Sequence, residues 1–227
     1  SQMTPILLAI ESRFHLSYQE YTDARIKMEN NSQNILVVFW ATGDLARRYL
    51  LPAISVLQGS QDIHVVLVWR RDWGEEDVGE FLFGIEQEFH AKQFDRSKFD
   101  YIKVDLLEQN QYKAIADYLD DRDLSFVNVI YYLALGPDFF VPVVKSLASF
   151  DLHLPQKWWD RRIVIEKPFG KDLETATHLN LAIRSVFPES RIYRIDHYLG
   201  KNAVHELQEF RLKQGTGWWA SQVRRIS

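Results

Sequence analysis

The chain has 227 residues, of which 46% are apolar and 14% are aromatic, and its formal net charge is −4. This composition supports a hydrophobic core and excludes a disordered chain, and the slightly negative charge gives no electrostatic signature of a nucleic-acid partner. The absence of cysteine excludes disulfides, thiolate catalysis and cysteine zinc sites. No apolar run approaches the length of a membrane span. We therefore expect a soluble, cytoplasmic protein with no nucleic-acid or membrane partner.

The N-terminal part of the chain is expected to be an appendage. Apolar residues recur at helical spacing over residues 4–28, which predicts an amphipathic helix. A polar break follows at residues 29–33. We interpret residues 1–33 as a helical extension before the main fold.

Beyond this break, strand patterns alternate with helix patterns. Apolar runs predict strands at 35–40, 63–69, 99–104, 126–135 and 162–165, and a further strand that begins at Arg191. Helical spacing predicts helices at 45–57, 75–92, 107–119, 137–150 and 172–187, the last with Asp172 as its N-cap. The alternation predicts an α/β fold with a doubly wound, Rossmann-like parallel sheet over residues 34–200. Residues 201–227 would form a helix and the start of a missing or reduced C-terminal domain.

The turn after the first strand is a candidate phosphate site, because ligands of doubly wound sheets bind at the carboxyl ends of the strands. Gly43 permits close approach of an anion to the backbone. As a glycine-rich fingerprint the turn is poor, since it has one glycine and the bulky Trp40 stands where the chain must turn. The alternative is an ordinary strand-to-helix turn with Thr42 or Asp44 as the N-cap.

Arg70, at the end of the second strand, bears on the choice of cofactor. In Rossmann-type folds an acidic residue at this point binds the ribose of NAD, whereas an arginine accommodates the 2′-phosphate of NADP. If a dinucleotide binds, Arg70 therefore favours NADP. The alternative is a surface salt bridge with Asp72 or with Glu75 and Glu76.

Residues 191–201 form a polar cluster at the end of a predicted strand. They contain three cations, one carboxylate, one imidazole and two phenols, a mixture that suits a bound anion. A carboxylate beside a histidine, such as Asp196 beside His197, can also orient an imidazole. The alternative is a solvated turn between a strand and a helix.

Four segments, in the same order along the chain, resemble motifs of glucose-6-phosphate dehydrogenases. Residues 42–46 are similar to that family's nucleotide turn, and residues 132–135 with Pro137 resemble its Tyr-Leu-Ala-x-x-Pro segment. Residues 165–173 are similar to its Glu-Lys-Pro-Phe-Gly motif, and residues 194–201 match its substrate-binding signature without a break. The resemblance covers residues 35–210 and implies an NADP-dependent oxidoreductase of the pentose phosphate pathway that oxidises glucose 6-phosphate to the 6-phosphoglucono-lactone.

The resemblance also implies roles for individual residues. Asp196 would orient a catalytic histidine that acts as general base, and Lys167 would lie between cofactor and sugar, before a cis Pro168. The residues implied to bind glucose 6-phosphate are Lys167, His197, Tyr198 and Lys201. Those implied to line NADP are Thr42, Gly43, Asp44, Leu45, Arg70, Tyr132 and Lys167. No metal is implied, and the seven histidines show no metal-ligand spacing.

The sequence departs from the family pattern at several positions. Trp40 replaces the first glycine of the turn, where an indole should crowd the pyrophosphate or force the turn open. Tyr49 replaces a lysine near the substrate, and Asn202 replaces an acidic residue. No residue after Lys201 matches the family's catalytic histidine, since His205 is better explained as a surface or packing residue.

Three interpretations therefore stay open. In the first, the chain is a truncated dehydrogenase. In the second, it is a catalytically inactive homologue, which either binds sugar phosphate and NADP or has a regulatory role. In the third, it is a structural module that self-associates as a homo-oligomer, because a missing domain would leave a strand edge and an apolar surface uncovered.

Overall fold

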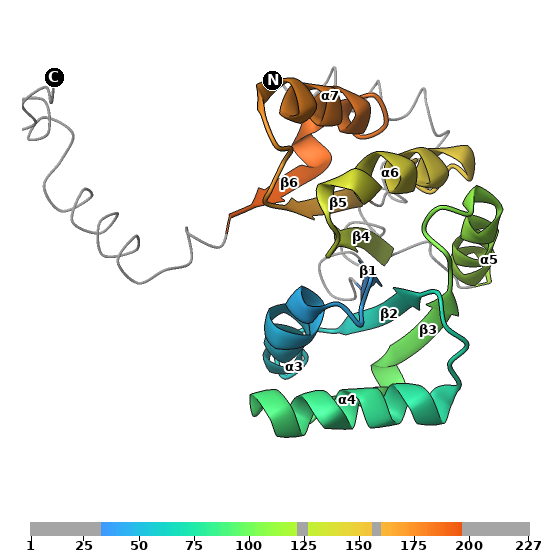
Figure 1. Ribbon diagram of the computed structural model, residues 1–227. Helices are drawn as coiled ribbons and strands as arrows, with labels where there is room; N and C mark the ends of the chain where they lie inside the picture. The colour runs from blue at the N-terminus through green and yellow to red at the C-terminus, as the bar shows by residue number, and fades with distance from the viewer. Residues whose placement is uncertain (1–32, 122–126, 156–159, 197–227) are drawn as a thin grey trace, which may run out of the picture. The chain divides into compact units, whose positions relative to one another are not determined.

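The computed structural model describes residues 33–121, 127–155 and 160–196, and Figure 1 shows a sheet in this part of the chain with helices on its two sides. The predicted N-terminal helix and residues 201–227 lie outside the described residues. The chain divides into two compact units, one that ends at Tyr193 and one that begins at Arg194.

The sheet has six strands in the order β3-β2-β1-β4-β5-β6. The pairings of β1 with β2 and β4, of β2 with β3, and of β4 with β5 are all parallel. This order confirms the predicted doubly wound sheet, and the direction of winding reverses between β1 and β4. The strands are β1 (Gln33–Phe39), β2 (Ile63–Trp69), β3 (Phe99–Lys103), β4 (Val127–Leu133), β5 (Arg161–Glu166) and β6 (Ile192–Ile195).

The described helices follow the predicted ones, with changes at their ends. The predicted helix at 45–57 contains a π-helical segment, η1, before α3, and the one at 75–92 ends at Phe89 because His90 adopts the left-handed conformation, with a φ of 50°. The side chain of Asp172 accepts a hydrogen bond from Thr175 N at 2.8 Å, which confirms it as the N-cap of α7. The α-helices are α3 (Leu51–Leu57), α4 (Glu75–Phe89), α5 (Lys113–Asp120), α6 (Phe140–Ser149) and α7 (Leu173–Arg184). The short helices are η1 (Ala46–Leu50), η2 (Arg96–Lys98), η3 (Gln109–Tyr112), η5 (Pro137–Phe139) and η6 (Glu189–Arg191).

Two hydrophobic clusters cover the two faces of the sheet. Val37 and Phe39 of β1 pack into a cluster with residues of α5, α6 and α7, and Val38 packs into a second cluster with α3 and α4. Because side chains alternate along a strand, a strand buried on both faces reads as a continuous apolar run. This accounts for the unbroken apolar sequence at 35–39, and it fixes β1 as the rigid support of the turn that follows it.

No helix among the described residues is long and apolar enough to cross a bilayer.

Candidate functional site

The candidate site is a crevice at the carboxyl ends of β1, β2, β4 and β5, where the winding of the sheet reverses. Two cavities lie along it, and Trp40 lines both. The arginine cavity, of about 320 Å³, is lined by Trp40, Thr42, Arg47, Trp69, Arg71, Trp73 and Phe81. The lysine cavity, of about 270 Å³, is lined by Trp40, Gly43, Asp44, Leu45, Ala134, Leu135, Gly136, Phe139, Glu166 and Lys167.

The turn after β1 is closed despite its bulky first residue. Gly43 N donates to Trp40 O at 2.8 Å, and Trp40 takes the left-handed conformation with a φ of 61°. A Cβ on Gly43 would lie 2.6 Å from Trp40 Cδ1, so the glycine is needed to accommodate the indole. The indole therefore does not force the turn open.

The Trp40 indole is held by aromatic rings from two other elements. Its centroid lies 4.9 Å from that of Trp69, at the end of β2, in an edge-to-face arrangement, and 5.5 Å from that of Phe139 in η5. The indole therefore spans the crevice between the two cavities.

Lys167 follows a buried carboxylate, that of Glu166, at the end of β5. Glu166 ends β5 and is 2% exposed, and it accepts a hydrogen bond from the hydroxyl of Tyr132 in β4. Burial, followed by this hydrogen bond and the carboxylate charge, raises the pKa of Tyr132. The Lys167–Pro168 peptide bond is cis, as the resemblance implied. Lys167 itself is exposed and lines the lysine cavity, where an ammonium group can contact an anionic or hydroxylated ligand.

The arginine cavity holds cations that the sequence reasoning missed. Arg71 and Arg47 line it, whereas the predicted Arg70 does not. Both Arg70 and Arg71 are exposed, and the Arg70 guanidinium lies 5.9 Å from the centroid of the Trp69 ring. Arg47 Nη2 pairs with Glu88 Oε2 at 2.7 Å. The Arg70-Arg71 doublet was the available signal, but choosing between the two requires the path of the chain after β2.

Tyr101 of β3 holds that segment in place. Its hydroxyl donates to Trp69 O at 2.8 Å and also contacts Arg71 O. Burial, assisted by the negative charge of Asp72, raises the pKa of Tyr101 to about 12. The phenol thus contacts the backbone carbonyls on either side of Arg70, those of Trp69 and Arg71.

We expect Tyr101 to make stability fall at alkaline pH. An unfolded tyrosine has a pKa near 10, so the raised pKa of Tyr101 contributes stability that is complete below pH ~10 and is lost as pH rises toward about 12. Urea denaturation at a series of pH values should show a shallower decline over this window for Tyr101→Phe than for the unsubstituted chain. Parallel declines would contradict the assignment.

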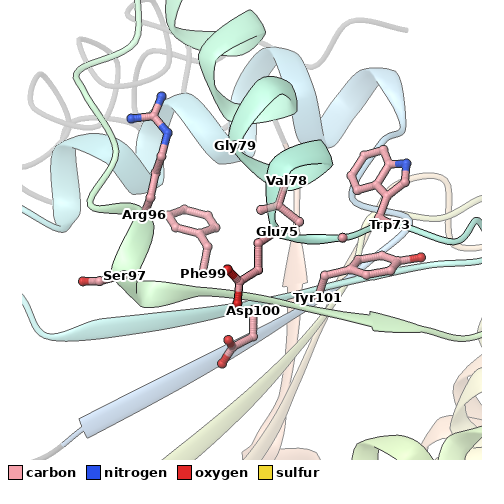
Figure 2. A pocket seen from close by; sticks show the side chains of 10 residues that line it. Trp73, Glu75, Val78, Gly79, Arg96, Ser97, Phe99, Asp100 and Tyr101 are labelled. Carbon is pink, nitrogen blue, oxygen red and sulfur yellow. The ribbon is translucent and has the colours of Figure 1, made fainter.

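A larger hollow, of about 680 Å³, lies beside the edge strand β3 and α4. Figure 2 shows Trp73 beside Tyr101 on its wall and Asp100 pointing away from Phe99. The carboxylate of Asp100 is bonded by Tyr118 at 2.5 Å and His64 at 2.7 Å, and Arg96 pairs with Glu86 at 3.0 Å. Asp100 and Arg96 are thus paired within the protein, and the hollow lies away from the carboxyl ends of the central strands, so we place the site in the crevice.

The remaining predicted residues fall in different places. Asp44 lines the lysine cavity, but its carboxylate is largely exposed and pairs with Arg48 at 2.6 Å. Tyr49 is 64% exposed. Asp196 follows β6 and is half-buried. His197, Tyr198, Lys201, Asn202 and His205 lie outside the described residues, so their roles stay predictions. Within the described ranges no group of three or more histidine or carboxylate side chains could hold a metal.

The decisive comparison is with protein families. The model described as "Glucose-6-phosphate dehydrogenase, NAD binding domain" matches residues 37–206. The chain belongs to the glucose-6-phosphate dehydrogenase family. This membership confirms the resemblance seen in the four motifs and identifies the sheet as that family's nicotinamide-coenzyme domain.

Individual family members agree. Glucose-6-phosphate 1-dehydrogenase of Bacillus subtilis is 36% identical over 196 residues, which are 82% of this chain and 40% of that protein. Glucose-6-phosphate 1-dehydrogenase 2 of Mycobacterium tuberculosis is 35% identical over 192 residues, 78% of this chain and 37% of that protein. The chain thus spans about 40% or less of these two relatives.

Solved structures of the family share the fold. The crystal structure of glucose-6-phosphate 1-dehydrogenase from Mycobacterium avium is 31% identical, with a TM-score of 0.65 over 79% of this chain and 40% of that one. A glucose-6-phosphate dehydrogenase in complex with its substrate glucose-6-phosphate is 26% identical, with a TM-score of 0.66 and the same coverage.

Proposed function

We propose that this chain is the coenzyme domain of a glucose-6-phosphate dehydrogenase and binds NADP in preference to NAD. The observation that carries the proposal is a crevice at the strand-order reversal with cations at both ends, Arg47 and Arg71 in the arginine cavity and Lys167 in the lysine cavity. Cations suit the phosphates of a dinucleotide, and the position is the one where doubly wound sheets bind nucleotides.

The two ends of the crevice fit a dinucleotide better than its centre does. Arg71 and Arg47 are placed to bind phosphate through charge-assisted hydrogen bonds, with Thr42 and Gly43 on the turn between the cavities. Lys167 would lie at the nicotinamide end. The Trp40 indole stands between the two ends, so the centre does not fit an extended dinucleotide as it stands. When bound, a nicotinamide cofactor supplies hydride transfer.

For the substrate we propose glucose 6-phosphate, held by Lys167, His197, Tyr198 and Lys201, with Asp196 orienting the general base of the complete site. Support comes from the unbroken signature at residues 194–201 and from the relative solved with this sugar phosphate. No residue of this sequence matches the general-base histidine. We therefore expect the 227-residue chain alone to bind ligands with little or no turnover. We place the function in the cytoplasm and the pentose phosphate pathway, and self-association of the chain stays a prediction.

Calorimetric titration of the purified chain with NADP and with NAD tests the proposal. We expect heat with NADP and a weaker response with NAD. If neither dinucleotide binds, even at millimolar concentration, the proposal that this chain binds NADP by itself fails. A spectrophotometric assay for NADPH with glucose 6-phosphate completes the test, and robust turnover would contradict the expected need for further residues.

Arg71, just after β2, should determine whether the chain prefers NADP or NAD. A charge-assisted hydrogen bond is worth roughly 1.5–3 kcal/mol, so Arg71→Ala should weaken NADP binding about tenfold or more and leave NAD binding nearly unchanged. Arg70→Ala is the matched control, because Arg70 is exposed outside the cavity lining. If Arg70→Ala alone abolishes the preference, the 2′-phosphate lies on Arg70, as the resemblance first implied. If both variants keep the preference for NADP, neither arginine accounts for it.

A further inference from the structure

Trp40 divides the crevice, and its neighbours show why it stays there. The ring packs on Trp69 and Phe139, which come from opposite sides of the strand-order reversal. Gly43 leaves room below it, since an added Cβ would lie 2.6 Å from Cδ1. Turn, glycine and both aromatic partners therefore favour one position of the indole, across the path between the two cavities.

The size of each cavity limits what can enter while the indole is in place. Pockets for drug-sized ligands are roughly 300–1,000 Å³. The arginine cavity, of about 320 Å³, lies at the lower end of this range, and the lysine cavity, of about 270 Å³, lies just below it. Each suits one half of a dinucleotide. A whole dinucleotide would have to cross the wall that Trp40 forms.

Two residues in the wall of the arginine cavity carry buried hydrogen-bond donors that have no acceptor among the described residues. Arg47 Nε and Trp69 Nε1 both belong to residues of its wall, and both atoms are buried with no partner in the part of the chain that the structure describes. Buried donors are normally paired. An anionic ligand that reached these groups when the Trp40 ring moved away from Trp69 would supply the acceptors.

We propose that Trp40 is an intrinsic plug that keeps the crevice in two compartments, so that the chain binds an adenosine phosphate in the arginine cavity without rearrangement but binds a dinucleotide only after the indole swings out. The inference rests on the proposed function. It adds that the Trp40 ring competes with the dinucleotide for the centre of the crevice. Part of the free energy of dinucleotide binding is then spent on displacing the ring.

Calorimetry with two probes, NADP and adenosine 2′,5′-bisphosphate, tests the plug in the 227-residue chain. Trp40→Gly removes the ring and suits the left-handed backbone at this position. We expect the dissociation constant for NADP to fall tenfold or more and that for the bisphosphate to change less than threefold. Trp73→Gly is the matched control, since Trp73 lines the arginine cavity but not the lysine cavity, and it should give no gain in NADP affinity.

The outcomes separate the plug from the function beneath it. If NADP binds the unsubstituted chain as tightly as Trp40→Gly, the plug is overturned and coenzyme binding stands. If neither probe binds either protein, coenzyme binding itself fails, and the plug with it. Should Trp40→Gly not fold, Phe139→Leu removes one ring that holds the indole and keeps the turn. It should tighten NADP binding threefold or more, and the absence of any gain would overturn the plug.

Discussion

Gly170→Ala is expected to lower the free energy of unfolding by roughly 3 kcal/mol, because it combines two penalties of about 1–3 kcal/mol each. Gly170 has a φ of 121°, a conformation that side-chain-bearing residues rarely adopt. A Cβ there would lie 2.6 Å from Ala176 N and 2.9 Å from Ala176 Cα. These are backbone atoms of α7 and cannot move aside cheaply. Urea denaturation followed by circular dichroism measures the loss.

Gly84→Ala is the control for this change. Gly84 is exposed within α4, and nothing lies within 4 Å of the position of an added Cβ. Alanine is favoured over glycine inside a helix by roughly 0.5–1 kcal/mol, so this variant should be more stable than the unsubstituted chain. Equal effects of the two alanines would show that backbone conformation at Gly170 is not limiting.

Phe39→Ala should cost about 3–5 kcal/mol, the usual range for truncating a buried phenylalanine. Phe39 is fully buried at the end of β1, and its ring lies 6.1 Å from that of Tyr112 and 6.4 Å from that of Tyr131. Deleting it opens a cavity directly beneath the turn that carries Trp40. Equilibrium denaturation should show the loss as a lower midpoint with an unchanged denaturant slope.

The same substitution at an exposed position provides the comparison. Phe83 lies in α4 and is 55% exposed, so Phe83→Ala should change stability by no more than about 0.5 kcal/mol. A cost for Phe39→Ala as small as this would mean that β1 is not packed on both faces.

The sheet could be predicted because its signals are local. The apolar run at 35–39 and the regular alternation of strand and helix patterns follow from burial on both faces, and burial leaves a mark on the sequence itself. The ends of the helices were harder to predict from the sequence. His90 ends α4 by taking a left-handed conformation that histidine adopts only occasionally, and no glycine or proline marks the position.

The site was predicted less completely, because it depends on relations between distant segments. Glu166 and Tyr132 were visible within motifs, but their hydrogen bond follows from the register of β4 against β5. Arg71 rather than Arg70 lines the cavity because of the way the chain leaves β2. Trp40 was seen to be out of place in its turn, whereas the direction of its indole is set by Trp69 and Phe139, rings 29 and 99 positions further along the chain.

The central place of β1 also governs how the chain can assemble. Gln33 pairs with Val127, and Asn128 donates a side-chain hydrogen bond to Asn34 across a separation of 94 residues. Closing so long a loop is slow compared with forming local helices. During synthesis, β1 therefore waits with one edge open until β4 has left the ribosome. The turn after β1 precedes β4 in the sequence, but it takes its final form only after β4 has been made.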